Sequence, residues 1–165
     1  MLSLFPIILA LLISDPAISK PTTSDMKLVG TAKYYFGPFK LYDAALLSED
    51  GRYSKENRFD LTLTYARDIS ATKLANASII EMARLTGKTE EELEHLRSPL
   101  ESCFGDVEKG VVITGQKLSA DKTNFFKNGE LTCQMQESDF SDAFFAIWLD
   151  PNGRYPSKTS SLIGK

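Results

Sequence analysis

Histidine and cysteine are scarce in this chain of 165 residues, which has one histidine, His95, and two cysteines, Cys103 and Cys133. Structural zinc sites are built from several such ligands close together, and the sequence has no Cys-x-x-Cys pair. Glu91 and His95 are spaced to share a metal ion on one helical face, but their acidic surroundings are typical of a solvated face. We therefore expect no metal site and no nucleophile activated by a histidine base.

The chain also lacks an excess of basic residues. It has 19 lysines and arginines against 22 aspartates and glutamates, for a formal net charge of −3. A nucleic-acid-binding domain typically shows a basic face, so nucleic acid is not expected as a partner. Gly105, Gly110 and Gly115 form no phosphate-binding loop, because none precedes a helix start with a lysine. No cofactor is therefore expected.

No apolar run is long enough to span a bilayer, which takes about 20 residues. The longest run extends from Leu2 to Ile13 and is broken by a Ser-Asp-Pro sequence. Ala17 and Ser19 then place small residues where a signal peptidase reads them, although no lysine or arginine precedes the run. We expect a secretory leader at residues 1–19, one domain at 20–165, a periplasmic or secreted location and no stable membrane span in the mature chain.

The two cysteines leave two interpretations open. In an oxidising compartment Cys103 and Cys133 can form a disulfide, and otherwise they are two small buried thiols. Their separation in the sequence does not fix the distance between them in the fold. We favour the two separate thiols.

The composition is that of a single globular domain, with 42% apolar and 25% charged residues. Lys27–Phe36 and Phe39–Leu47 read as strands on either side of Gly37-Pro38. The clearest alternation runs from Arg58 to Tyr65, which predicts a strand with one face in the core and one face in water.

The periodicity then changes to that of helices. Asp68 is expected to cap a helix over Ile69–Thr86. Thr89 and Glu92 match a capping box, which predicts a second helix ending near Pro99.

Three further strands are expected around Val111–Ile113, Thr123–Phe126 and Leu131–Met135, with a tight turn at Asn128-Gly129. Ser138 is expected to cap a last helix, followed only by a polar tail. In this helix large rings recur every four residues and should be buried, namely Phe140, Phe144 and Trp148. Strand hairpins with grouped helices indicate an α+β fold.

Five stretches of the sequence carry a family resemblance. They are GPFKLYDAAL at 37–46, LTLTYAR at 61–67, DVEKG at 106–110, NFFKNGE at 124–130 and FFAIWLDP at 144–151. In order and spacing they resemble bacterial chalcone isomerase-like proteins across nearly the whole mature chain. The resemblance implies an open-faced sandwich, in which helices cover the concave face of a large antiparallel sheet. A cleft between the two layers could hold a flat apolar ligand.

The resemblance also bears on catalysis. Plant members of the family close a ring, using an arginine before the first core strand and a threonine within it, with a tyrosine and an asparagine elsewhere. Here Gly37 stands at the threonine position and no arginine precedes Phe36. Because ring closure depends on positioning and charge stabilisation, we expect the space between sheet and helices to lack the guanidinium it needs.

The favoured hypothesis is a non-catalytic protein that binds an apolar, fatty-acid-like or anionic amphipathic ligand. A ring-closing isomerase and a structural or interaction protein without a ligand are the alternatives. Tyr34 and Tyr42 are candidates to line the cleft, although most rings on adjacent strands are core residues. Tyr65 is the candidate hydrogen-bond donor and Arg67 the candidate cation. The alternative for that pair is a half-buried ring beside a surface salt bridge.

Overall fold

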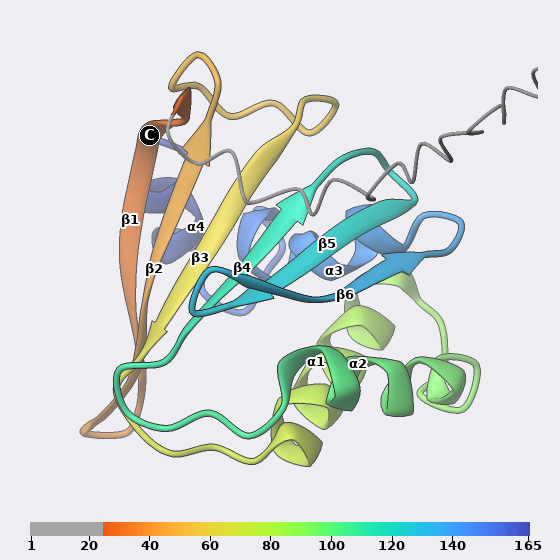
Figure 1. Cartoon of the computed structure of the whole chain (residues 1–165). Helices are drawn as coiled ribbons and strands as arrows, with labels where there is room; N and C mark the ends of the chain where they lie inside the picture. The colour runs from red at the N-terminus through yellow and green to blue at the C-terminus, as the bar shows by residue number, and fades with distance from the viewer. Residues whose placement is uncertain (1–24) are drawn as a thin grey trace, which may run out of the picture.

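The computed structural model describes residues 25–165, so the expected leader at residues 1–19 lies outside the described residues. Within the described part, six strands form one antiparallel sheet in the order β1-β2-β3-β4-β5-β6. They are β1 (Lys27–Phe36), β2 (Phe39–Ser48), β3 (Phe59–Tyr65), β4 (Val112–Lys117), β5 (Lys122–Lys127) and β6 (Glu130–Gln136). Strands adjacent in sequence are also adjacent in the sheet (Figure 1).

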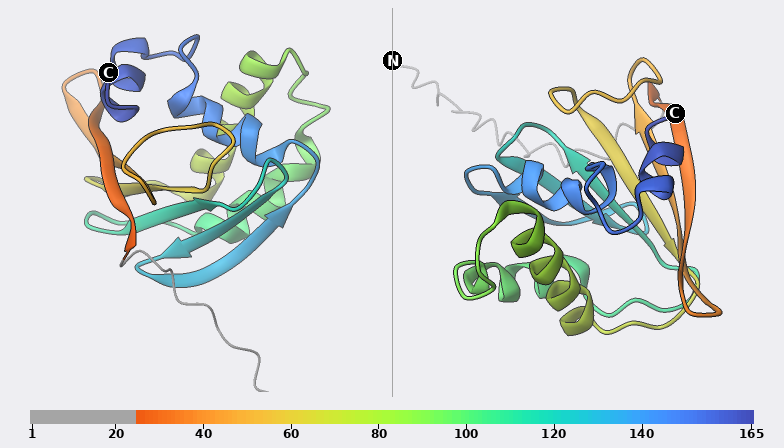
Figure 2. Two further views of the ribbon diagram at one scale, coloured as in Figure 1. Left: turned by 90° about the horizontal axis from the view of Figure 1, so that it is seen from above. Right: turned by 180° about the vertical axis from the view of Figure 1, so that it is seen from behind.

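The helices are inserted at two points of this meander. Between β3 and β4 come α1 (Ala71–Thr86), the 3₁₀ turn η2 (Glu94–Leu96) and α2 (Arg97–Phe104), and after β6 come α3 (Phe140–Leu149) and α4 (Pro156–Leu162). The sheet curves around its helices, which gather on its concave side (Figure 2). The predicted α+β architecture is therefore confirmed.

The strand β3 shows why the two faces of the sheet differ. Its alternating apolar residues Leu61, Leu63 and Tyr65 are buried under the helices. Its intervening threonines face the other way, where Thr62 Oγ1 lies 3.1 Å from Thr114 Oγ1 of β4. Alternation thus gives one apolar and one polar face, as the sequence predicts. The predicted exposure to water is wrong at Asp60, which belongs to the polar face but is buried.

The N-cap of α1 lies two residues later than the predicted cap. Ser70 is the N-cap, and its side chain accepts a hydrogen bond from the backbone N–H of Lys73. Ile69 remains extended because it pairs with Val107 through two backbone hydrogen bonds of 2.9 and 3.0 Å. Asp68 instead accepts a hydrogen bond from the backbone N–H of Lys109.

The predicted second helix is displaced as well. Thr89 and Glu92 form the reciprocal hydrogen bonds of a capping box, but only turns and η2 follow, and α2 begins at Arg97. Pro99 lies inside the first turn of α2 rather than at a helix end. A proline is tolerated there because the first N–H groups of a helix have no partner within the helix.

The C-terminal region contains one confirmed turn and one unexpected helix. Asn128 and Gly129 have positive φ values of 49° and 82°, as a tight turn between β5 and β6 requires. The helix α3 has Asp139, not Ser138, as its N-cap. The expected polar tail is wrong, because α4 forms there and packs on β1. A Cβ added at Gly30 would collide with the carbonyl oxygen of Ser161, so only glycine allows this approach.

A disulfide joins Cys103 of α2 to Cys133 of β6, with 5.2 Å between the Cα atoms. Thr132 Oγ1 also donates a hydrogen bond of 2.7 Å to the carbonyl oxygen of Cys103. The preference for two separate thiols is therefore wrong, and the bridge ties α2 to the edge strand. Across residues 25–165, no helix combines the length and apolar character that a membrane crossing requires.

Candidate functional site

A cavity of about 170 Å³ lies between the concave face of the sheet and the helices. Its floor is formed by two cross-strand pairs of β3 and β4, Leu63–Ile113 and Leu61–Gly115. Its other walls come from α1 and α3, which contribute the side chains of Leu74, Ala77, Ser78, Phe144, Ile147 and Trp148. The lining is mainly apolar, as is typical of small-molecule sites.

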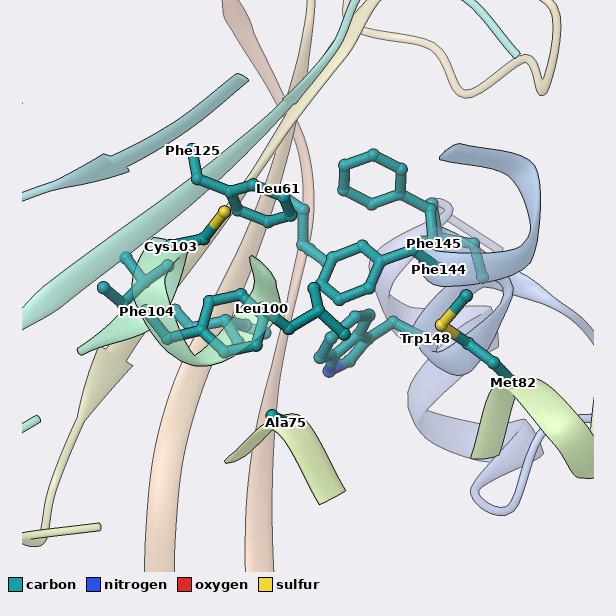
Figure 3. Packing of buried hydrophobic residues seen from close by; sticks show 14 of the residues in the cluster. Leu61, Ala75, Met82, Leu100, Cys103, Phe104, Phe125, Phe144, Phe145 and Trp148 are labelled. Atoms are coloured by element: carbon teal, nitrogen blue, oxygen red, sulfur yellow. The ribbon is translucent and has the colours of Figure 1, made fainter. Parts of the chain in front are cut away.

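The rings of α3 fix the shape of this cavity. Figure 3 shows Phe144 and Trp148 from α3 meeting Phe125 from the sheet in one apolar cluster. Phe144 packs edge-on against Phe125 and Trp148, with centroid distances of 5.2 and 5.3 Å. Phe140, Phe144 and Trp148 are all buried, so the predicted stripe of the last helix is confirmed.

Three tyrosines line the cavity at one end of the strands. Tyr34, Tyr42 and Tyr65 lie opposite one another on β1, β2 and β3. The rings of Tyr34 and Tyr42 stack at 4.9 Å, and Tyr65 meets Tyr42 edge-on at 5.6 Å. Trp148 Nε1 donates a hydrogen bond of 3.1 Å to the Tyr42 hydroxyl, which links this end to α3.

Burial keeps these tyrosines protonated. It raises the pKa of Tyr42 to about 12, and it also raises the pKa of Tyr34 and of Tyr65 above the ordinary value. A tyrosine hydroxyl is protonated at neutral pH in any case, and burial extends this state of these three hydrogen-bond donors to more basic solution. This end of the cavity offers polarity without charge.

The structure brings together three of the four candidate ligand-binding residues and leaves the fourth outside. Tyr34, Tyr42 and Tyr65 line the cavity, but Arg67 does not. Arg67 is exposed, and its guanidinium lies 4.5 Å from the centroid of the Phe39 ring. Its geometry is that of a surface cation–π contact.

The cation on the cavity wall is a residue that the sequence did not single out. Arg154 precedes α4, and its Nε donates a hydrogen bond of 2.8 Å to Glu81 Oε1 of α1. Arg84 holds the other oxygen of Glu81, with Nη2 at 3.0 Å. The side chain of Arg154 is 55% exposed and that of Glu81 only 14%, so the pair forms the rim of the cavity.

This rim overturns one expectation. The space between sheet and helices was expected to lack a guanidinium, and Arg154 supplies one beside Tyr155. Burial opposes ionisation of Glu81, but hydrogen bonds and charge from Arg154 and Arg84 outweigh it and hold the pKa of Glu81 below its ordinary value. Glu81 and Arg154 are therefore an ion pair at neutral pH.

The sequence did contain one signal for this segment. Pro156 follows Arg154 and Tyr155 directly and occupies the first turn of α4, where proline is favoured. A helix starting there would have placed Arg154 near a folded element instead of in a tail. Within residues 25–165, no group of three or more potential metal-ligating side chains comes together.

A family profile described as chalcone isomerase-like matches residues 15–158. The chain belongs to the chalcone isomerase-like family. A curated relative, an uncharacterised protein of Haemophilus influenzae, is 28% identical in an alignment of 141 residues that covers 83% of this chain and 67% of that protein.

Among solved structures, the chain is similar to the fatty-acid binding protein of Arabidopsis thaliana. The two superpose with a TM-score of 0.67 over 91% of each chain, at 10% sequence identity. At this identity the likeness establishes the fold alone. It confirms that this member has the sheet-and-helix architecture of the chalcone isomerase-like fold.

Proposed function

We propose that this chalcone isomerase-like protein is a non-catalytic binding protein for a fatty-acid-like carboxylate. The observation that carries the proposal is an apolar cavity with the partly exposed Arg154–Glu81 ion pair at its rim. An acyl chain gains about 0.8 kcal/mol for each methylene that leaves water for such a cavity. The structural neighbour from Arabidopsis thaliana is itself a fatty-acid binding protein, which supports this ligand class.

The rim provides a place for the ligand carboxylate. Arg154 is half exposed and lies on a short segment between two helices, so its guanidinium is accessible from solvent. A guanidinium binds a carboxylate through two parallel hydrogen bonds, and a ligand carboxylate can take the place of Glu81 on Arg154. The hydroxyls of Tyr34 and Tyr155, whose rings both line the cavity and lie 5.8 Å apart, can donate further hydrogen bonds.

Calorimetric titration with a straight-chain fatty acid and with its methyl ester tests the proposal. Arg154→Gln should weaken binding of the acid at least tenfold and leave the ester nearly unaffected. Glu81→Gln should tighten binding of the acid, because the ligand no longer competes with Glu81. Arg84→Gln is the matched control, since Arg84 also pairs with Glu81 but does not line the cavity. Failure of the unmodified protein to bind any fatty acid or ester would refute the proposal.

Ring-closing isomerisation is a second candidate, favoured by one observation. Arg154 places a guanidinium on a wall that also carries the hydroxyls of Tyr34 and Tyr155, and such groups can hold a phenolate and polarise a ketone. Glu81 opposes this role because it already neutralises Arg154. Incubation with a chalcone, followed by absorbance, separates the two functions: consumption above the spontaneous rate favours the isomerase.

We also propose that the protein is exported and works in the periplasm or outside the cell. The Cys103–Cys133 disulfide supports an oxidising compartment, and the apolar run at residues 2–13 supports a cleaved leader. Intact-mass measurement on protein from its own host should give a chain that starts at Lys20. Native mass spectrometry of the same sample would reveal a copurified ligand. A mass equal to that of the chain alone would favour a structural protein without a ligand.

A further inference from the structure

A second cavity lies next to the first and shares one wall residue with it. This second cavity, of about 250 Å³, has apolar walls from Phe59, Phe145, Ala146 and Leu149. Phe145 also lines the first cavity. One buried ring, only 2% exposed, therefore borders both spaces.

The register of β3 and β4 shows that the two cavities lie in line. On the concave face, the floor of the first cavity ends at the pair Leu61–Gly115, and the next pair along, Phe59–Lys117, belongs to the second. Successive pairs on one face of a sheet are about 7 Å apart. A chain lying along these strands in the first cavity would therefore point at the second.

Phe145 blocks that path, and Gly115 makes room for it. A Cβ added at Gly115 would lie 3.1 Å from two atoms of the Phe145 ring, so the ring rests directly on the glycine. The ring also packs edge-on against Phe59, with centroids 4.9 Å apart. The Phe145 ring thus lies at the boundary between the two cavities.

Besides its apolar walls, the second cavity has a charged wall. Lys117, only 3% exposed, lies with its Nζ 2.7 Å from Asp142 Oδ1 and also donates a hydrogen bond to the carbonyl oxygen of Lys55. Lys117 and Asp142 neutralise each other, and the apolar residues of this cavity can contact a hydrocarbon chain beside the ion pair. The space beyond Phe145 can therefore lengthen the site by a limited amount.

We propose that Phe145 is the residue that sets the length of acyl chain this protein holds, by separating the ligand cavity from an apolar extension. The inference rests on the proposed function. Chains that end before Phe145 are fully buried, and longer chains have to displace its ring or remain partly in water. Phe145 is a specificity-determining residue and takes no part in binding the carboxylate.

Titration with saturated fatty acids of increasing chain length tests this proposal. In the unmodified protein, affinity should rise by about fourfold for each added methylene and then level off where the chain meets Phe145. Phe145→Ala should move this plateau to longer chains. Adding Ala146→Phe, which refills only the second cavity, should move the plateau back.

Two further variants separate chain selection from loss of packing. Phe140 is a buried residue of α3, and its ring lines neither cavity. Phe140→Ala should therefore lower the melting temperature without moving the plateau. Phe145→Leu is the milder variant to use if Phe145→Ala does not fold. If a Phe145 variant folds and its plateau is unchanged, Phe145 does not limit the chain length, and only this further inference is overturned. If the protein binds no fatty acid of any chain length, the proposed function is refuted as well.

Discussion

The inner wall and the rim of the cavity are built on different principles. The inner wall is made of interlocking rings on α3, such as Phe144 and Trp148, whose neighbours are fixed by packing. The rim is made of Arg154 and Glu81, which meet across 73 positions of sequence through an ion pair that is half open to solvent. Packed rings hold one arrangement, whereas an exposed ion pair can exchange its partner.

This difference separates stability from ligand recognition. Substitutions in the wall should change the free energy of unfolding strongly, because each ring has many buried neighbours. Substitutions at the rim should change stability by only about 1 kcal/mol and alter the affinity for charged ligands. A rim substitution that unfolds the protein would break the comparison.

The largest effect is expected for Trp148→Ala. Trp148 is 7% exposed, packs on Phe144 and donates a hydrogen bond to Tyr42. Its removal should cost roughly 3–5 kcal/mol of stability, the range for large buried aromatic residues. Urea unfolding of both proteins measures this difference, and an unchanged midpoint would show that α3 is not packed as described.

The next largest effect is expected for loss of the disulfide. Cys103 and Cys133 are separated by 30 positions, and a crosslink that closes a loop of this size stabilises by about 3–4 kcal/mol through the unfolded chain. The double variant Cys103→Ala/Cys133→Ala should lose about that amount. The unmodified protein should lose a similar amount in reducing buffer, while the variant should not respond to reductant.

The wall could be predicted from sequence, because its signals are local. The alternation around Leu61 and Leu63 and the four-residue spacing from Phe140 to Trp148 each lie within one element. A buried face imposes such a period on the residues that form it. Tyr34, Tyr42 and Tyr65, which were candidates because of their places on adjacent strands, also line the cavity.

The rim could not be predicted in this way, because its partners are distant in sequence. Glu81 and Arg154 belong to different elements, and no period links them. The helix α4 has seven residues, of which only Thr159 and Leu162 are buried, and a helix so short is not stable without tertiary contacts. Its position depends on the close approach to Gly30, which no local pattern encodes.

A smaller effect is expected from the ionisation of Glu81. Its pKa is lower in the folded protein than its ordinary value, so its contribution to stability is fully present above the ordinary carboxyl pKa and is lost as the pH falls through the folded value. Because Arg154 is half exposed, this contribution should be on the order of 1 kcal/mol. Glu81→Gln should therefore be less stable at neutral pH, and the difference should vanish in acid. A constant difference at all pH values would mean that packing is the cause.

The smallest effect on stability is expected for Arg67→Ala. This substitution tests Arg67, the cation expected from the sequence, against Arg154, the cation that lines the cavity. Arg67 stacks on exposed Phe39 outside the cavity, and such a contact is worth about 0.5–1 kcal/mol. Its removal should shift the unfolding midpoint slightly and leave fatty-acid affinity unchanged, whereas Arg154→Gln should weaken binding of the fatty acid. If Arg67→Ala weakened carboxylate binding and Arg154→Gln did not, the ligand would bind at the outer end of β3, and the rim would be a structural ion pair.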